Sequence, residues 1–246
     1  VVPVECASSK AEWAARTLRP RLHRHVERFL VVLRSTPLRR DSLGLRFEGF
    51  DVSDPDAALA RLRLDTSVPA VERYRGGTSQ ARRVLREFMT ERLVRYHENR
   101  NQPQTDDVSH LSKYLHFGQI SPVEAALAVR DAARGAKEDI ETFLEELIVR
   151  RELSHNYVHY CADYDRYASL PEWARKTLRR HQRDPRPHCY PREQLERGET
   201  HDPYWNAAMK EMRLTGYMHN YMRMYWGKKI LEWSATPEEA FDTTLA

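Results

Sequence analysis

Apolar residues recur at helical spacing from Thr78 to the end of the chain, and no alternation typical of a sheet interrupts them. One such set shares a helix face: Leu85, Phe88, Met89 and Leu93. A strand would instead place successive side chains on opposite faces of a sheet. We therefore expect the main domain to be all-α.

Local signals mark where several of these helices begin and end. Ser121 is followed by Pro122 and, two residues later, by Glu124, which is typical of a capped helix start. Thr215-Gly216 is expected to separate two helices. Helices are predicted over 10–33 (interrupted or restarted near Pro20), 139–160, 204–214 and 217–233, and from Pro171 and Pro237.

The N-terminal part of the chain follows a different pattern. Residues 1–6 begin with a short apolar run, which predicts a buried strand. Prolines and the Gly76-Gly77 pair within 35–77 predict a linker, with a short helix around 55–63 and a domain boundary near residue 70. The absence of an initial methionine and the stop just after an expected helix start indicate a piece of a longer protein.

Composition narrows the class of protein. Hydrophobic residues make up 41% and charged residues 31%, which is typical of a globular chain, and no apolar run reaches the length of a membrane span. The three cysteines form no CxxC pair, which excludes a disulfide scaffold and a zinc ribbon. We expect a reducing compartment, cytoplasmic or nuclear, and a monomer with no membrane partner.

Arginine dominates the positive charge. Of the 40 basic residues 33 are arginine, and the net charge is +4. The bias reflects either genomic composition or contacts with phosphates and bases, which a planar guanidinium makes well. The stretch 16–40 holds eight arginines and one glutamate, and is interpreted as a solvated helix face or as a phosphate-facing surface.

Three segments carry residues suited to chemistry. In 109–118 (SHLSKYLHFG), two serines at a helix start cap the helix or bind a phosphate. In 143–156, Glu146 and Arg150 lie one turn apart and form an ion pair or part of a site. Trp205, Trp226 and Trp233 are core aromatics or an electron-transfer chain.

A fourth pattern concerns metal binding. His155, His159 and Cys161 have the spacing of metal ligands on a helix, but no second pair of ligands lies nearby in the sequence. We expect these side chains to pack or to form hydrogen bonds, and we predict no metal site.

Four stretches, in this order and separation, resemble the class II cyclobutane-pyrimidine-dimer photolyases of the photolyase/cryptochrome family. They are LSKYLHFGQIS at 111–121, FLEELIVRRELS at 143–154, HDPYWNAA at 201–208 and MHNYMRMYWGKKILEWS at 218–234. The resemblance covers nearly the whole chain, and the fourth stretch is the most specific.

The resemblance implies a fold and an activity. It implies a mainly α protein whose helical domain, 71–246, binds FAD, after an interdomain linker at 41–70 and a remnant of an α/β antenna domain at 1–40. The family uses light and reduced FAD to repair cyclobutane pyrimidine dimers in UV-damaged double-stranded DNA, and its antenna domain can hold a second chromophore. Glu5 and Cys6 depart from the aromatic and aliphatic residues usual there.

The resemblance also implies roles for individual residues. The flavin contacts are Tyr96, Ser109, Leu111, Ser112, Arg150 and Arg223. The residues that face the dimer are Glu146, Asn220 and Met224. Arg100 is implied as a DNA-backbone contact. The photoreduction chain consists of Trp226, Trp205 and Trp233, with Tyr190 as a side branch.

Two other functions stay open on the same scaffold. One is a flavin photoreceptor of the cryptochrome type, and the other is an inactive DNA-binding remnant. Retention of Glu146, Asn220 and Met224 favours repair over sensing. Retention of the tryptophan set argues against a remnant, because a protein without flavin chemistry has no use for photoreduction.

Overall fold

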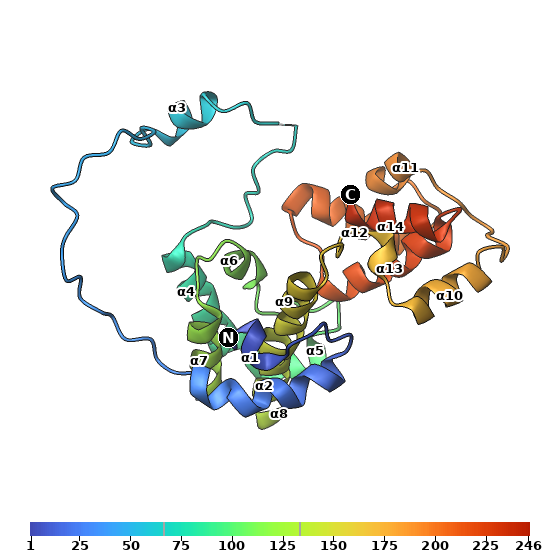
Figure 1. The fold of residues 1–246 in the computed structure, drawn as a ribbon. Helices are drawn as coiled ribbons and strands as arrows, with labels where there is room; N and C mark the ends of the chain where they lie inside the picture. Colours follow the sequence, from blue (N-terminus) through green and yellow to red (C-terminus); the bar gives the residue numbers. More distant parts are fainter. Residues whose placement is uncertain (66, 133) are drawn as a thin grey trace. The chain divides into compact units, whose positions relative to one another are not determined.

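The computed structural model describes residues 1–65, 67–132 and 134–246, which contain helices and no strand (Figure 1). The mainly helical fold predicted from the sequence is confirmed. Val1–Val32 and Arg73–Ala246 together form one compact unit, and Leu33–Glu72 forms a second. The assignment of 1–40 to an antenna-domain remnant, 41–70 to a linker and 71–246 to a flavin domain stays a prediction.

The predicted strand at residues 1–6 is wrong. The chain instead forms helix α1 (Val4–Ala7), in which the Cys6 and Ala7 amides donate to the Pro3 carbonyl. A buried strand needs a neighbouring strand for its N–H and C=O groups, and the described residues provide none. The burial was predicted correctly, because Val2 is only 2% exposed.

Helix α2 (Ala15–Phe29) contains Pro20 and continues through it, so the predicted interruption is wrong. Leu18 and Leu22 lie on either side of the proline and are fully buried. They pack in one cluster with Val149, which lies in the helix predicted at 139–160. This packing holds the helix together despite the backbone hydrogen bond that proline removes.

The second unit, Leu33–Glu72, contains one helix among its described residues, α3 (Pro55–Ala60), close to the predicted 55–63. Its start follows local chemistry. The Asp54 carboxylate accepts hydrogen bonds from the Asp56 and Ala57 amides, and Pro55 occupies the first helical position.

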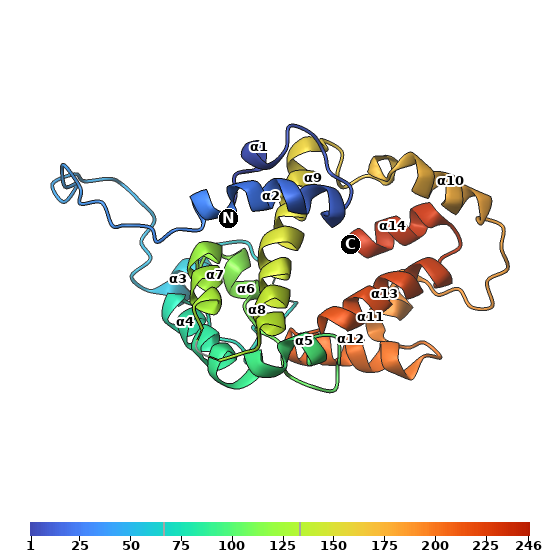
Figure 2. The ribbon, with the colours of Figure 1, turned by 90° about the horizontal axis from the view of Figure 1, so that it is seen from below.

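The rest of the main unit is a set of helices joined by turns and loops, the loop between α10 and α11 being extended (Figures 1 and 2). The α-helices are α4 (Thr78–Glu87), α5 (Tyr96–Asn99), α6 (Ser112–His116), α7 (Pro122–Arg130), α8 (Lys137–Leu144), α9 (Arg151–Tyr160), α10 (Glu172–Arg180), α11 (Arg192–Arg197), α12 (Pro203–Thr215), α13 (Asn220–Trp233) and α14 (Pro237–Leu245). Short π or 3-10 turns are η1 (Phe88–Arg92), η2 (Leu93–Arg95), η3 (Glu145–Arg150) and η4 (Tyr167–Ser169).

Several predicted boundaries are confirmed. The Ser121 hydroxyl accepts from the Val123 amide at 3.2 Å, as expected for the start of α7. Gly216, with φ of 66°, ends α12, because this left-handed conformation favours glycine. Within the described residues, no helix combines the length and the apolar character of a membrane span.

The predicted helix at 139–160 is one rod made of α8, η3 and α9 (Figure 2). Its middle, Glu145–Arg150, is a π turn, which inserts one residue relative to an α-helix and so shifts the direction of the side chains that follow. The rod packs against α2 and α7, and it carries one wall of the site described below.

Two apolar clusters support the site. The first contains an aromatic triangle of Phe88, Tyr96 and Phe143, with ring centroids 5.1 to 5.8 Å apart. The second surrounds Trp205 and Trp233, each 1% exposed, on helices α12 and α13. The first cluster supports the polar turn of the site, and the second holds the indole rings.

Candidate functional site

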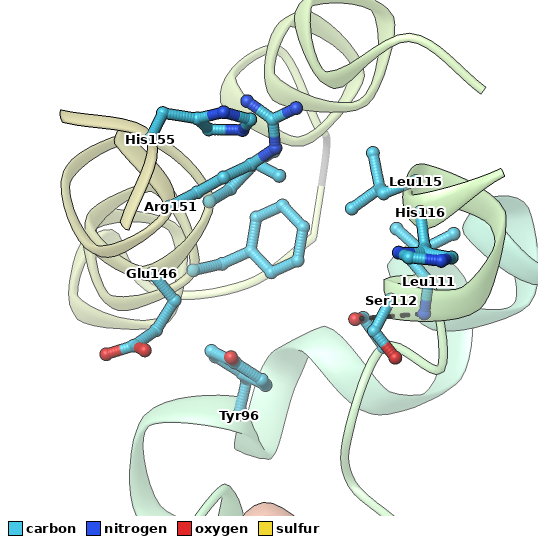
Figure 3. A pocket seen from close by; sticks show the side chains of 11 residues that line it. Tyr96, Leu111, Ser112, Leu115, His116, Glu146, Arg151 and His155 are labelled. Atoms are coloured by element: carbon cyan, nitrogen blue, oxygen red, sulfur yellow. Dashed lines mark hydrogen bonds between the residues drawn. The ribbon is translucent and has the colours of Figure 1, made fainter. Parts of the chain in front are cut away.

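A cavity of about 440 Å³, here called the Ser112 cavity, lies between the central rod and the turn that precedes α6 (Figure 3). Arg151 and His155 of α9 face Leu115 and His116 of α6 across it, and Tyr96 closes one end. The full lining is Tyr96, Ser109, Leu111, Ser112, Leu115, His116, Phe143, Glu146, Leu147, Arg151 and His155. Apolar walls therefore enclose a few polar groups, as in small-molecule sites generally.

A second cavity of about 220 Å³, here called the Arg223 cavity, shares part of this wall. It brings together residues from four distant segments of the sequence. They are Tyr96, Arg100, Val108, Ser109, His110, Leu111, Ser112, Lys113, Glu146, Tyr217, Asn220 and Arg223. The two cavities thus contain most of the residues that the sequence assigned to cofactor, substrate and DNA.

The turn that presents Ser109 and Ser112 has an unusual backbone. His110 adopts φ of 53°, and it is the one non-glycine residue with positive φ in the described chain. Such a conformation costs free energy and persists only where its surroundings hold it. The His110 side chain, 6% exposed, lies between two partners that do so: Tyr74 Oη is 3.1 Å from Nδ1, and Asp106 Oδ1 is 2.8 Å from Nε2.

Burial lowers the pKa of His110, and the nearby Asp106 carboxylate opposes that shift only in part. The imidazole is therefore neutral at neutral pH. Because a carboxylate can only accept, Nε2–H donates to Asp106, and Nδ1 is left to accept from the Tyr74 hydroxyl. The turn is held by a directed chain of hydrogen bonds, Tyr74 to His110 to Asp106.

Lys113 lines the Arg223 cavity, and the sequence gave it no role. Its ammonium donates to the His110 carbonyl at 2.9 Å and lies 3.1 Å from the centroid of the Tyr74 ring. Burial, with nearby Arg73 and Arg92, lowers the pKa of Lys113 to about 8. The only signal in the sequence was its position directly after Ser112.

Glu146 pairs with Arg100, at 2.8 Å, and not with Arg150 one helical turn away. Arg150 instead lies 3.6 Å from Glu145, whose pKa is lowered mainly by its hydrogen bonds to Arg19. The π turn accounts for this, since it changes which side chains lie above one another on the rod.

Arg150 lines a third cavity of about 870 Å³, together with Arg19, Glu145 and both members of the Arg100–Glu146 pair. Arg151, which the sequence did not single out, lines the Ser112 cavity where Arg150 was expected. The proposed flavin contact of Arg150 therefore stays a prediction, and the structure does not place this side chain with Ser109 and Ser112.

Helix α13 contributes Asn220 and Arg223 to the Arg223 cavity. Met224 lines none of the three cavities described and is 49% exposed. His219 caps α13 by accepting from the Tyr221 amide at 3.1 Å, and its own Nε2 is buried without a hydrogen-bond partner among the described residues.

The three predicted tryptophans form one continuous series of ring contacts, here called the indole chain. Trp226 stacks on Trp205 with centroids 5.7 Å apart and planes at 23°. Trp205 meets Trp233 edge-on at 5.4 Å, and Trp233 meets Tyr190 edge-on at 5.5 Å. The structure thus brings together the four residues that the sequence grouped for electron transfer.

The cavity residues fit a phosphate-bearing cofactor with a flat ring. Ser109 and Ser112 offer hydroxyls, and Lys113 and Arg223 add cations that have no carboxylate partner within the described residues. Anions bind well where hydroxyls and cations converge in this way. Leu111, Phe143 and Leu147 supply apolar surface for a ring.

No family model matches the chain, but several curated proteins do. Over the whole chain it is 48% identical to a deoxyribodipyrimidine photo-lyase from Methanothermobacter thermautotrophicus, 40% to one from Potorous tridactylus and 41% to one from Oryza sativa subsp. japonica. The chain covers 53%, 46% and 49% of these proteins, so it spans about half the length of the curated relatives it matches.

A solved structure supports the fold. A class III photolyase from Agrobacterium tumefaciens matches with a TM-score of 0.50 and 23% identity, over 69% of this chain and 37% of that one. The identities of 40–48% over the full chain lead to one conclusion: the chain belongs to the deoxyribodipyrimidine photo-lyase family.

Proposed function

We propose that the protein carrying this chain uses light and reduced FAD to repair cyclobutane pyrimidine dimers in DNA. The observation that carries the proposal is the convergence of Ser109, Ser112, Glu146, Asn220 and Arg223 on two adjoining cavities. Relatives named deoxyribodipyrimidine photo-lyase support the same activity.

In this proposal the flavin lies along the two cavities. Its contacts in these cavities are Tyr96, Ser109, Leu111, Ser112 and Arg223, with Lys113 added from the structure. Arg150, which lines the third cavity instead, stays a predicted flavin contact. Hydroxyls and cations bind the phosphates, and the Tyr96 phenol, whose pKa burial raises to about 12, stays a neutral donor. A bound reduced flavin supplies, on absorbing light, the electron that opens the cyclobutane ring.

Glu146, Asn220 and Met224 are proposed to face the dimer. The structure supports this for Glu146 and Asn220, which share the Arg223 cavity. Glu146 is held by Arg100, and a DNA phosphate that drew Arg100 away would leave the carboxyl free to hydrogen-bond the dimer. Hydrogen-bond donors placed where negative charge develops stabilise a dimer radical anion, and the NH2 group of Asn220 is such a donor.

The DNA substrate is proposed to be a duplex from which the dimer is flipped out. A damaged pair costs less to unstack than an intact one, so flipping itself favours the lesion. Arg100 is the proposed backbone contact, and affinity that depends on arginine–phosphate contacts falls as the salt concentration rises. The chain is proposed to act as a monomer, and an antenna chromophore can bind outside it.

The indole chain is proposed to reduce oxidised flavin by passing electrons to it in the light. Trp226, Trp205 and Trp233 lie in series at centroid distances of 5.4 to 5.7 Å, and Tyr190 extends the series by one step. Such spacing allows an electron to hop from ring to ring.

The test is blue-light repair of a thymine-dimer oligonucleotide by the full-length protein, with a dark control. We expect repair in the light only, and a several-fold lower yield in Glu146→Gln at unchanged flavin content. Glu141→Gln on the same rod, which lines neither the Ser112 nor the Arg223 cavity, is the matched control. Bound flavin without repair would indicate a cryptochrome-like photoreceptor, and DNA binding without flavin would indicate an inactive remnant.

A further inference from the structure

The end of the indole chain carries a tyrosine–histidine pair with short, directed contacts. Tyr190 Oη lies 2.6 Å from His201 Nδ1 and accepts from the His201 backbone amide at 3.2 Å. In the tautomer of His201 that carries its proton on Nε2, Nδ1 is an acceptor and the phenol donates its proton to it. The Tyr190 amide also donates to the Trp233 carbonyl at 3.1 Å, which fixes this residue on the last indole.

The first two indoles of the chain, Trp226 and Trp205, have no comparable partner. Trp226 Nε1 is buried without a hydrogen-bond partner in the part of the chain that the structure describes. Trp205 Nε1 donates to the Leu195 carbonyl at 3.1 Å, and a carbonyl is not a base that takes up a proton at neutral pH. A positive charge on either ring is therefore not fixed by loss of a proton.

From this contrast we propose that His201 is the proton acceptor that lets Tyr190 trap the positive charge of the indole chain. The proposal rests on the proposed function, because the charge enters at Trp226 with a photoexcited oxidised flavin as the oxidant. His201 thereby becomes a functional residue of the light-driven electron transfer.

The step balances in electrons and protons. One electron passes from Tyr190 to the Trp233 radical cation, and the phenolic proton passes from Oη to His201 Nδ1. The products are neutral Trp233, a neutral tyrosyl radical and a His201 imidazolium. Because a tyrosine phenol becomes a strong acid only on oxidation, the base must already be in place when the electron leaves.

The surroundings of His201 suit this role. The residue is exposed, so an imidazolium formed there can release its proton to water. Its ring also lies 5.4 Å from the Trp233 ring and stacks on His188 at 3.9 Å. Among the described residues no carboxylate lies within salt-bridge distance of His201 to hold the proton permanently.

The experiment is transient absorption of the flavin-loaded full-length protein after a laser flash, with His201→Asn as the test variant. Asparagine places an oxygen near the Nδ1 position, so it keeps a hydrogen-bond acceptor but removes the base. We expect the tryptophan radical to form at the wild-type rate, while the tyrosyl yield falls about tenfold or more. His188→Asn is the control: it removes a ring that stacks on His201 and, at 6.2 Å, on Tyr190, but that forms no hydrogen bond with the phenol among the described residues, so it should leave that yield unchanged.

A second arm separates this proposal from the proposed function. The charge is generated without flavin, by flash-quench with a ruthenium tris-bipyridine photo-oxidant, and the part due to Tyr190 is isolated by subtracting Tyr190→Phe. Absence of a tryptophan radical in the first arm would overturn the photoreduction role of the indole chain. Equal Tyr190 radical yields in wild type and His201→Asn in the second arm would overturn the role of His201, whatever the first arm shows.

Discussion

The molecule contains two tyrosine–histidine pairs joined through the same atoms, Oη and Nδ1. In Tyr74–His110 the distance is 3.1 Å, the imidazole is 6% exposed, and Asp106 holds its second nitrogen. In Tyr190–His201 the distance is 2.6 Å, and the histidine is exposed beside the indole chain. The buried pair holds a strained backbone, whereas the exposed pair has the surroundings that the proposed proton transfer requires.

The strained backbone at His110 explains why its pair must be permanent. A residue at φ of 53° returns to a commoner conformation unless its side chain is held, and both nitrogens of His110 are occupied in holding it. The backbone of His201 is not in this strained region, and its ring forms a hydrogen bond only with the Tyr190 phenol among the described residues.

The largest expected effect comes from removing each imidazole. His110→Ala loses two hydrogen bonds and leaves the strained turn unsupported, so we expect the free energy of unfolding to fall by about 2–3 kcal/mol. His201→Ala acts at an exposed position and should change it by no more than about 0.5 kcal/mol. Urea denaturation followed by circular dichroism measures both free energies of unfolding. Similar losses in the two variants would contradict the claim that only the His110 pair stabilises the fold.

A smaller effect is expected from removing each phenolic hydroxyl. Tyr74→Phe keeps the ring under Lys113 but leaves His110 Nδ1 without its donor, which should cost about 1 kcal/mol. Tyr190→Phe should cost less than about 0.5 kcal/mol, since its histidine partner can turn to water instead. The midpoints of urea unfolding show which variant loses more stability. A larger loss in Tyr190→Phe than in Tyr74→Phe would contradict the expectation.

The smallest expected effect is a dependence of the free energy of unfolding on pH. Burial lowers the pKa of His110, so between its folded value and the unfolded value near 6.5 the unfolded chain binds more protons than the folded one. The free energy of unfolding should therefore rise with pH through this window and level off above about pH 6.5.

His110→Asn isolates the contribution of this residue, because asparagine tolerates positive φ and does not titrate. Burial also lowers the pKa values of His155 and His219, but both residues are present in wild type and variant alike. A shallower slope in the variant is the expected result of urea titrations at several pH values. An unchanged slope would show that His110 does not contribute to it.

Most of the fold follows from local signals in the sequence. Caps such as Ser121 and stops such as Gly216 lie where the residue type predicts them, since each satisfies a backbone requirement of its own helix. The errors at residues 1–6 and at Pro20 have a common physical cause. Short apolar runs do not distinguish a strand from a buried helix, and packing of Leu18 and Leu22 overrides proline.

The site was predicted less completely, because partners distant in sequence decide its geometry. The grouping of Trp205, Trp226 and Trp233 followed from their motifs, and the structure brings the rings together. The pairing of Glu146 with Arg100 depends on a π turn, which no local sequence pattern predicts. Likewise, the roles of Lys113 and His201 depend on rings that neighbour them only after folding.

The division of the chain into two units has a consequence for how its length can vary. Val1–Val32 and Arg73–Ala246 share one core, in which Leu18 and Leu22 pack with Val149, so Leu33–Glu72 is topologically a closed loop on that core. Closing a loop becomes only about 0.6 kcal/mol more costly for each doubling of its length. Lengthening or shortening this segment should therefore change the free energy of unfolding of the unit formed by Val1–Val32 and Arg73–Ala246 only slightly.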